Sequence, residues 1–286
     1  MPPRDLEILK LLRRYYYLRA RQVQGRLLPH DDDCAITRSR LRRLIEQGLV
    51  RKHQPKMVDP FSGNNSAAPI YTITAKGASM LVAEEGDNKQ LLAGETGFGQ
   101  WLSLNHYCSL SSLHMIIDDA LAGKSYVKQT GLYFEHELLD PEAKDLSKRY
   151  VLHTTVSKPG EKPLFFCPDS AFETEVKGHR RAWMTEYETG SDVPRRVVAK
   201  KHKGVAGFAA GGHLTTIFPQ SRDFRVIAFC PNAGWRDALR REFVGKPGHE
   251  FWLFCSTLAV KTETFLHESI LFTSDKGPFP FLPRPS

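Results

Sequence analysis

Residues 167–192, CPDSAFETEVKGHRRAWMTEYETGSD, contain two strand-like segments, and each of them carries acids near one end. Asp169 follows Pro168 where the first segment opens, and Glu186 and Glu188 lie where the second one closes. Because side chains alternate along a strand, Glu186 and Glu188 are expected on the same face. Carboxylates that converge from neighbouring strands can hold Mg²⁺ through hard oxygen atoms. The alternative is that all three are ordinary surface acids, since Pro-Asp is a common turn pair.

The segments on either side of this stretch predict an α/β domain. Helices are expected over 109–123, 193–211 and 235–245, a strand or short helix over 131–139, and strands over 149–156, 162–175, 180–188, 224–230 and 250–260. This order gives a mixed sheet with helices on its faces. The tail after residue 260 is rich in proline and reads as irregular.

The same order of elements resembles the PD-(D/E)xK nuclease core, in which an Asp and an acid-x-Lys motif come from adjacent strands. Asp169 and Glu186 match the two acids, and they would hold Mg²⁺. The lysine of the motif is replaced by Glu188, which would assist them. Lys200 or Lys201 on the following helix would then stabilise the charge of the phosphate transition state. An additional upstream acid would come from Glu135 or Glu137.

The positive charge of the chain is confined to its N-terminal part. Of 40 Lys and Arg and 32 Asp and Glu residues, the first 56 positions hold 14 bases and 6 acids, so the remainder is neutral. A basic module of this size is typical of proteins that bind a polyanion, most often nucleic acid. The alternative is a solvated helical surface without a partner.

The N-terminal segments predict a winged helix-turn-helix over residues 1–88. Helices are expected over 4–15, 19–28, 37–48 and 75–85, with strands from residue 49 and over 70–74 and a polar wing loop over 54–69. Acids at 31–33 can cap the third helix, and Gly48 would close it. LIEQGLVRK followed by IYTITAKGASML resembles the corresponding segments of bacterial winged-helix domains.

The third helix carries the candidate DNA-binding residues. Leu41, Leu44 and Ile45 share its expected buried side, so the polar positions face away from it. The candidates for phosphate and base contacts in the major groove are Arg38, Ser39, Arg40, Arg42 and Arg43, with Lys52 beside the wing. The alternative is a winged helix used for protein contacts or dimerisation.

Residues 87–100 are rich in Gly and polar residues and predict a joint, so a second domain is expected over 98–286. The expected fold class is therefore α+β: an N-terminal winged helix followed by a restriction-endonuclease-like α/β domain with a mixed sheet. Five scattered cysteines without a CxxC pair argue against a zinc module or a disulfide framework. Without an apolar signal segment or membrane span, a cytoplasmic protein is expected.

The whole pattern resembles the replication-relaxation family of plasmids and integrated mobile elements. The resemblance covers about residues 5–230 and rests on the order of LNHYCSLSSLHMIIDDAL, LYFEHELL, PDSAFETE and WMTEYETGSD. The family positions would be held by His106, Asp169, Glu186, Glu188, Gly190 and Ser191. The family's Arg-Gly-Thr is here Thr189-Gly190-Ser191, so that loop departs from the pattern.

The resemblance implies a protein of plasmid or mobile-element replication that acts on double-stranded DNA, as a Mg²⁺-dependent nickase or endonuclease that relaxes supercoils. Expected partners are a second copy of the chain in a homodimer and replication or mobilisation proteins. The first alternative is a non-catalytic transcriptional regulator or replication accessory with a degenerate nuclease-like domain. A further alternative is a sensor whose α/β domain binds a small ligand.

Overall fold

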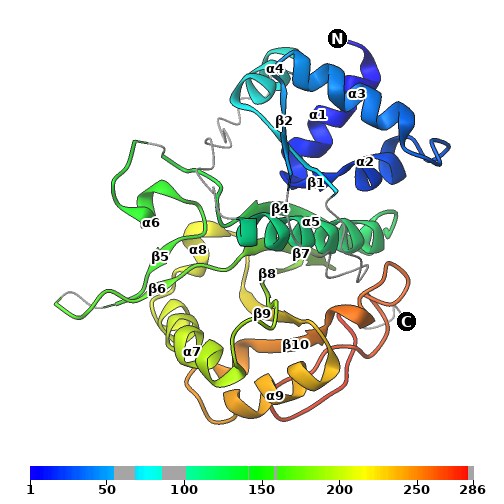
Figure 1. The fold of residues 1–286 in the computed structure, drawn as a ribbon. Coiled ribbons are helices and arrows are strands. Elements are labelled where there is room, and N and C mark those ends of the chain that lie inside the picture. Colours follow the sequence, from blue (N-terminus) through cyan, green and yellow to red (C-terminus); the bar gives the residue numbers. More distant parts are fainter. Residues whose placement is uncertain (55–67, 86–100, 141, 158–159, 283–286) are drawn as a thin grey trace. The chain divides into compact units, whose positions relative to one another are not determined.

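The structure, a computed structural model, describes residues 1–54, 68–85, 101–140, 142–157 and 160–282 (Figure 1). It is a mixed α+β protein that divides into two compact units, Met1–Met115 and Ile116–Ser286. The division falls inside α5 (Trp101–Leu121), beyond the boundary that composition indicated. The predicted joint at 87–100 and most of the predicted wing loop lie outside the described residues. No described helix is long and apolar enough to cross a membrane.

Within its described residues, the first unit contains four helices ahead of α5 and a small antiparallel sheet with strand order β1-β3-β2. Its elements are α1 Pro3–Tyr15, β1 Leu18–Arg19, α2 Ala20–Leu27, α3 Ala35–Glu46, β2 Val50–His53, β3 Ile70–Ile73 and α4 Ala75–Glu85. The predicted helices and the two predicted strands are confirmed. The two-residue strand β1 has no periodicity of its own, and it is defined by its pairing with β3.

Local chemistry sets both ends of α3. The Asp31 carboxylate accepts hydrogen bonds from the backbone N–H of Ile36 at 3.1 Å and of Thr37 at 2.7 Å, which satisfies donors that the first turn leaves open. Beyond the last turn, Gly48 has φ +71°, a left-handed conformation that suits glycine. Leu41 and Leu44 between these ends are fully buried. The predicted cap and stop of this helix are thus confirmed.

The first half of α5 packs against the first unit. Ser111 donates a hydrogen bond to the Tyr15 carbonyl at 2.6 Å, and the rings of Tyr17 and Tyr107 stack with their centroids 5.0 Å apart. Burial of Tyr15 and Tyr17, each 2% exposed, depends on these contacts as well as on the preceding helices. The division therefore follows side-chain packing rather than the glycine-rich composition of the joint.

The second unit is built on a five-stranded mixed sheet with order β10-β9-β8-β7-β4. Its strands and helices are β4 Val127–Phe134, α6 Leu146–Arg149, β5 Thr154–Thr155, β6 Phe165–Phe166, β7 Ser170–Val176, β8 His179–Tyr187, α7 Pro194–Ala210, α8 Leu214–Ile217, β9 Asp223–Cys230, α9 Ala233–Phe243 and β10 Trp252–Ser256, with short 3₁₀ turns at His249–Phe251 and Thr257–Ala259. Neighbours among β4, β7 and β8 are antiparallel, whereas β8, β9 and β10 are parallel. The expected mixed sheet is confirmed.

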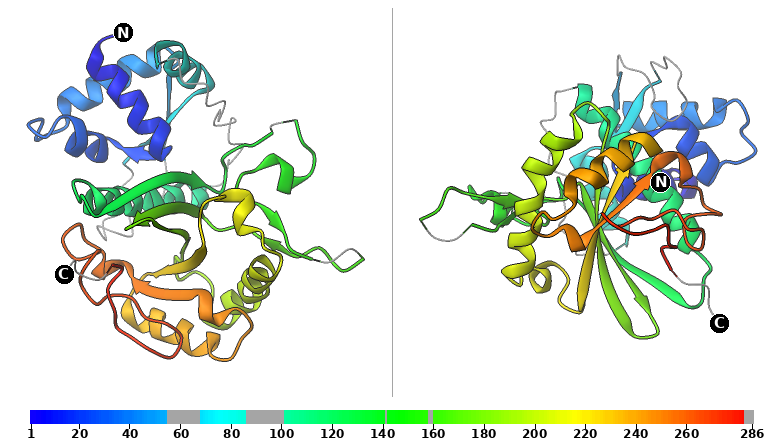
Figure 2. Two further views of the ribbon diagram at one scale, coloured as in Figure 1. Left: turned by 180° about the vertical axis from the view of Figure 1, so that it is seen from behind. Right: turned by 90° about the horizontal axis from the view of Figure 1, so that it is seen from below.

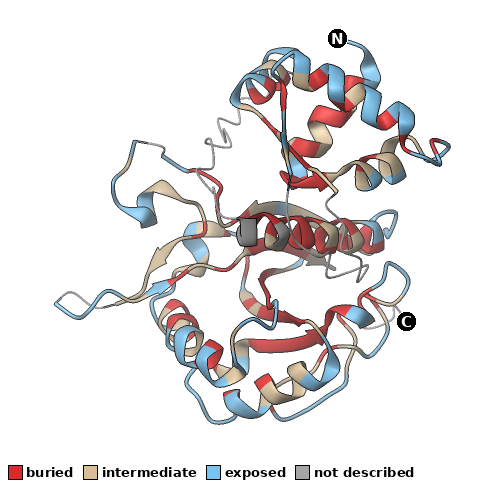
Figure 3. Cartoon of the chain, viewed as in Figure 1, coloured by how far each residue is buried: buried red, intermediate tan, exposed pale blue. Residues whose placement is uncertain are grey.

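Helices α7 and α9 pack on one face of this sheet through their apolar sides (Figure 3). Ala182 and Met184 of β8 belong to the resulting core, together with Val205 and Phe208 of α7. Glu186 continues the same alternation along β8, so its side chain is directed to the face that α7 covers. The period of the strand therefore decides that this acid is buried.

The C-terminal segment contributes to the core on the other face of the sheet. The ring of Phe281 lies 4.2 Å from that of Trp183 and 4.6 Å from that of Phe265, measured between centroids. All three side chains are buried. Over residues 261–282 the tail does lack regular helices and strands, but Phe265 and Phe281 are core residues.

Candidate functional site

The acids of the opening stretch lie at one edge of the five-stranded sheet. β7 and β8 pair in antiparallel register with Ser170 opposite Thr185, so Asp169 and Glu186 follow at the same end of neighbouring strands. The backbone N–H of Tyr187 donates a hydrogen bond of 2.6 Å to Oδ2 of Asp169. This bond fixes the Asp169 carboxylate against the end of β8.

A third strand brings Glu135 to the same edge. Its backbone N–H donates to the Asp169 carbonyl at 3.0 Å, which continues the β4–β7 ladder by one residue. Burial, followed by the charges of Glu135, Glu186 and Asp169, raises the pKa of the Cys167 thiol, so these groups lie close to it. Glu137, the other upstream candidate, is also buried and accepts a hydrogen bond from the Phe134 backbone at 3.3 Å.

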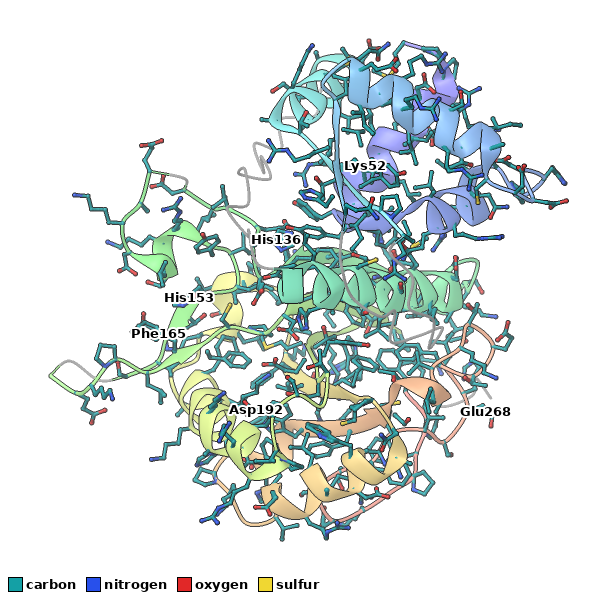
Figure 4. The ribbon with its side chains drawn as sticks, viewed as in Figure 1. Lys52, His136, His153, Phe165, Asp192 and Glu268 are labelled. Carbon is teal, nitrogen blue, oxygen red and sulfur yellow. The ribbon has the colours of Figure 1, made fainter. Side chains whose placement is uncertain are left out.

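The two candidate lysines of α7 have different environments. Nζ of Lys201 lies 2.5 Å from Oε2 of Glu186 and 3.0 Å from Oε1 of Glu188. Nζ of Lys200 lies 2.6 Å from Oδ2 of Asp192, which is labelled in Figure 4. The Lys200 side chain is 61% exposed. The structure thus brings Lys201, and not Lys200, to the acids.

Burial dominates the electrostatics of this cluster. It raises the pKa of Glu186 to about 8; the charge of Lys201 opposes this change, and the charges of Asp169 and Glu188 add to it. Burial also disfavours the charge on Lys201, but the carboxylates of Glu186, Asp169 and Glu188 outweigh it and raise the pKa of the ammonium group. Lys201 therefore carries its charge at neutral pH among acids that repel one another.

The donor atoms of this cluster are chemically suited to a hard divalent cation. All of them are carboxylate oxygens, and Oε1 of Glu188 is buried without a hydrogen bond although it faces the Lys201 ammonium. Across the described ranges, however, no three acid, imidazole or thiolate groups gather in a metal-binding arrangement. The chemistry of the donors thus fits Mg²⁺, whereas Lys201 contacts two of the acids in this arrangement.

The loop after β8 packs tightly against the beginning of α9. Gly190 has φ +78°, and a Cβ atom there would lie 3.2 Å from Cγ of Pro231. The hydroxyl groups of Thr189 and Ser191 lie 2.8 Å apart across the glycine. His106, the other position of the resemblance, lies on α5 in the first unit, half-buried and with its ring edge against Tyr107.

The arginines of α3 divide into two groups. Arg38 and Arg42 are exposed, as is Ser39, whereas Arg40 and Arg43 contact the buried Asp5 of α1. Their guanidinium nitrogens lie 2.7 and 2.6 Å from the Asp5 oxygens. Two of the predicted DNA contacts therefore also hold α3 against α1.

The remaining predicted contacts lie on one side of the first unit. Burial raises the pKa of Tyr71 in β3, and the charges of Arg38 and Arg42 act against this change, so both guanidinium groups lie near that strand. Lys52 of β2 is exposed and pairs in register with Tyr71 (Figure 4). Strand pairing thus places Lys52 close to Arg38 and Arg42.

Sequence reasoning missed the role of Asp5. This acid is 1% exposed and precedes Ile8, Leu9 and Leu12 in the apolar stripe of α1. The sequence did contain a signal for this contact: an acid stands within an apolar stripe, and the chain also has an arginine-rich helix that could supply its partner. Asp192, the partner of Lys200, gave no comparable signal because it lies in a polar turn.

Comparison of the chain with protein-family models, with curated proteins and with solved structures finds no match.

Proposed function

We propose that this protein binds duplex DNA through its first unit and cuts a DNA phosphodiester bond at the Asp169–Glu186–Lys201 cluster of its second unit. The observation that carries the proposal is the contact of Lys201 with Glu186 and Glu188, 2.5 and 3.0 Å, at the sheet edge where Asp169 also lies. A lysine from the following helix then supplies the charge that the acid-x-acid motif lacks on its strand.

The topology of the second unit supports this proposal. The antiparallel succession β4, β7, β8, followed by α7 and the parallel strand β9, is the arrangement typical of a PD-(D/E)xK core. In that arrangement the first acid opens the second strand and the next acid closes the third. Asp169 and Glu186 stand at those positions.

The cluster has the parts that phosphodiester hydrolysis needs. Asp169 and Glu186 would hold Mg²⁺, with Glu188 beside them. Bound Mg²⁺ would polarise the scissile phosphate and lower the pKa of an attacking water. Lys201, which is charged at neutral pH, would stabilise the negative charge that develops on the phosphate oxygens.

The first unit supports the DNA-binding part of the proposal. Its order, α1-β1-α2-α3-β2-β3-α4 with a β1-β3-β2 sheet, is typical of a winged helix. Arg38, Ser39 and Arg42 on the exposed side of α3 would enter the major groove, and Lys52 would contact a phosphate. A cytoplasmic homodimer that acts in plasmid or mobile-element replication, with replication or mobilisation proteins as partners, belongs to the same proposal.

A nicking assay tests the proposal. Supercoiled plasmid is incubated with the protein and Mg²⁺ or Mn²⁺, and the wild type is compared with Asp169→Ala, Glu186→Ala and Lys201→Ala. Lys200→Ala is the matched control, because Lys200 is the adjacent lysine and contacts only Asp192 among the acids of this region. Gel shifts with duplex DNA, with and without EDTA, show whether each variant still binds.

Nicking by the wild type and by Lys200→Ala, with a loss of about a hundredfold or more in the other three variants, is the expected result. Binding by all variants without cutting by any of them would contradict the proposed cleavage.

That outcome would favour the second candidate, a non-catalytic DNA-binding regulator or replication accessory. A specific observation supports it: Lys201 already contacts two acids of the cluster, and the described part of the chain gathers no metal-binding group of three. In this case the cluster holds α7 against β8.

A further inference from the structure

An arm, described over residues 139–140, 142–157 and 160–166, is inserted between β4 and β7 and extends away from the five-stranded sheet (Figures 1 and 2). It carries α6 and the two-stranded β5–β6 ladder, in which Thr155 pairs with Phe165. The Phe165 side chain is exposed, with 44% of its surface accessible, and its ring centroid lies 4.9 Å from that of His153 (Figure 4). The arm thus presents the exposed ring of Phe165 beside the half-buried ring of His153.

The chain leads from these rings directly to the candidate site. Asp169 lies four residue steps after Phe165, a distance of at most about 14 Å for an extended chain. A Cβ atom on Gly204 of α7 would lie 2.8 Å from the Phe165 carbonyl oxygen, so the two backbones are in close contact. Farther along, the Cys167 thiol lies near the Lys201 charge. The segment 165–169 therefore follows α7 from Gly204 to Lys201.

Exposed bases lie along this path, together with exposed acids of the arm. Lys203 is exposed on α7 next to Gly204, and the arm contributes the exposed Lys148 and Lys162, with Asp145 close to Lys148 and Glu161 next to Lys162. Near the N-terminal end of α7, Arg195, Arg196 and Lys200 are also exposed, and the last two contact Asp192. An exposed aromatic ring with cations nearby is a feature with which proteins bind unpaired nucleic acid, because bases stack on the ring and phosphates face the cations.

We propose that the Phe165–His153 ring pair stacks bases of an unpaired DNA strand and thereby guides that strand along α7 to Lys201. This inference rests on the proposed cleavage function and names its substrate: single-stranded DNA, or duplex DNA that is locally unpaired. Stacking accepts any base, so the second unit contributes no sequence preference, and the choice of site is left to the first unit.

Equilibrium binding of a fluorescein-labelled oligothymidylate to the full-length protein tests the inference. The titrations contain EDTA, which prevents metal-dependent cleavage, and a saturating unlabelled duplex, which occupies the duplex-binding surface of the first unit. The variants are Phe165→Ala, His153→Ala and the conservative Phe165→Trp. Leu258→Ala is the matched control, since Leu258 is a more exposed apolar residue, 69% accessible, outside the arm.

Phe165→Ala is expected to weaken binding of the oligothymidylate about tenfold, and Phe165→Trp and Leu258→Ala are expected to preserve it. Absence of binding by the wild type, or equal affinity of the wild type and Phe165→Ala, would overturn the inference. Circular dichroism of each variant shows whether the arm substitution disturbs the fold. Phe165 would instead have a packing role if Phe165→Ala weakens binding of the oligothymidylate, Phe165→Trp does not restore this binding, and the melting temperature of Phe165→Ala is lowered. This result would also overturn the inference.

The outcome is distinct from that of the nicking assay. A protein that binds the oligothymidylate through Phe165 and never nicks DNA would retain the proposed strand-binding arm and lose the proposed cleavage. A protein that nicks DNA with equal efficiency in the wild type and Phe165→Ala, and binds the oligothymidylate equally in both, would retain cleavage and lose the arm.

Discussion

At the scale of single residues, burial decides which of many charged side chains have a specific role. Lys200 and Lys201 are adjacent in the sequence, yet one helical step turns Lys201 toward Glu186 and leaves Lys200 at the surface. Arg42 and Arg43 are both exposed, but of the two only Arg43 contacts the buried Asp5. Substitution of each of two adjacent residues of the same type therefore distinguishes the residue that makes a specific contact from the one that is only a surface charge.

Replacement of Glu186 by Gln should change the pH dependence of stability. Burial raises the pKa of Glu186 from 4.5 to about 8, so between these values the folded protein holds a proton that the unfolded chain has released. The free energy of unfolding of the wild type should therefore fall, relative to that of Glu186→Gln, as the pH rises from about 5 to about 8.

Urea titrations of both proteins across this range measure the difference. A constant difference between the two free energies at every pH would show that Glu186 is already ionised at the acid end.

Arg42→Ala and Arg43→Ala should have different effects. Arg42 is exposed, so its loss should leave stability unchanged within about 0.5 kcal/mol, weaken duplex binding several-fold and reduce the salt slope of binding by about one. Loss of Arg43 leaves the buried Asp5 with Arg40 alone and should lower the free energy of unfolding by roughly 1 kcal/mol. Thermal melts and binding titrations at several salt concentrations provide both readouts, and identical behaviour of the two variants would refute this division.

At the scale of elements, close backbone approach fixes how helices meet strands. Gly77 of α4 lies against the loop that enters β2, where a Cβ atom would come within 2.3 Å of the Leu49 carbonyl oxygen. That carbonyl also accepts a hydrogen bond from the Thr74 backbone at 3.0 Å. The glycine thus allows α4 to begin directly against the exit of α3.

Gly77→Ala should therefore lower the free energy of unfolding by roughly 2 kcal/mol or more, because backbone atoms cannot move aside as a flexible side chain can. Gly25 of α2 is the matched control: nothing lies within 4 Å of its Cβ position, so Gly25→Ala should stabilise the protein by about 0.5–1 kcal/mol. Chemical denaturation of both variants measures the two signs. A stable Gly77→Ala protein would mean that α4 and β2 are not packed as described.

At the scale of the whole molecule, the limits of the two units depend on packing within a helix. The first half of α5 contributes Tyr107 and Ser111 to the first unit, whereas Asp118 near its end accepts a hydrogen bond from Gln129 of β4 at 2.8 Å. One helix thus contributes residues to both units.

A fragment of residues 1–115 should therefore unfold cooperatively and at a higher temperature than a fragment of residues 1–88. The shorter fragment lacks the ring of Tyr107 against Tyr17 and the partner of the Tyr15 carbonyl, and it exposes apolar surface. Circular dichroism melts of the two fragments, with Tyr107→Ala in the longer one as a control, measure the contribution. Equal melting temperatures would place the boundary near residue 88 instead.

Helices and strands with a clear period or a clear cap can be predicted from the sequence. The apolar stripe of α1, the Asp31 cap and Gly48 stop of α3, and the alternation along β8 are all local signals, because they depend on residues a few positions apart. The placement of Asp169 and Glu186 at one sheet edge also followed from the sequence, since a short turn between two strands imposes antiparallel pairing.

Four features follow from the packing of distant segments alone: Lys201 meets the acids, Arg40 and Arg43 contact Asp5, half of α5 belongs to the first unit, and Phe265 and Phe281 of the tail are core residues. Each of these depends on the distance between segments far apart in the chain. Local periodicity says which side of a helix is buried but not what covers it, because that is set by packing over the whole molecule.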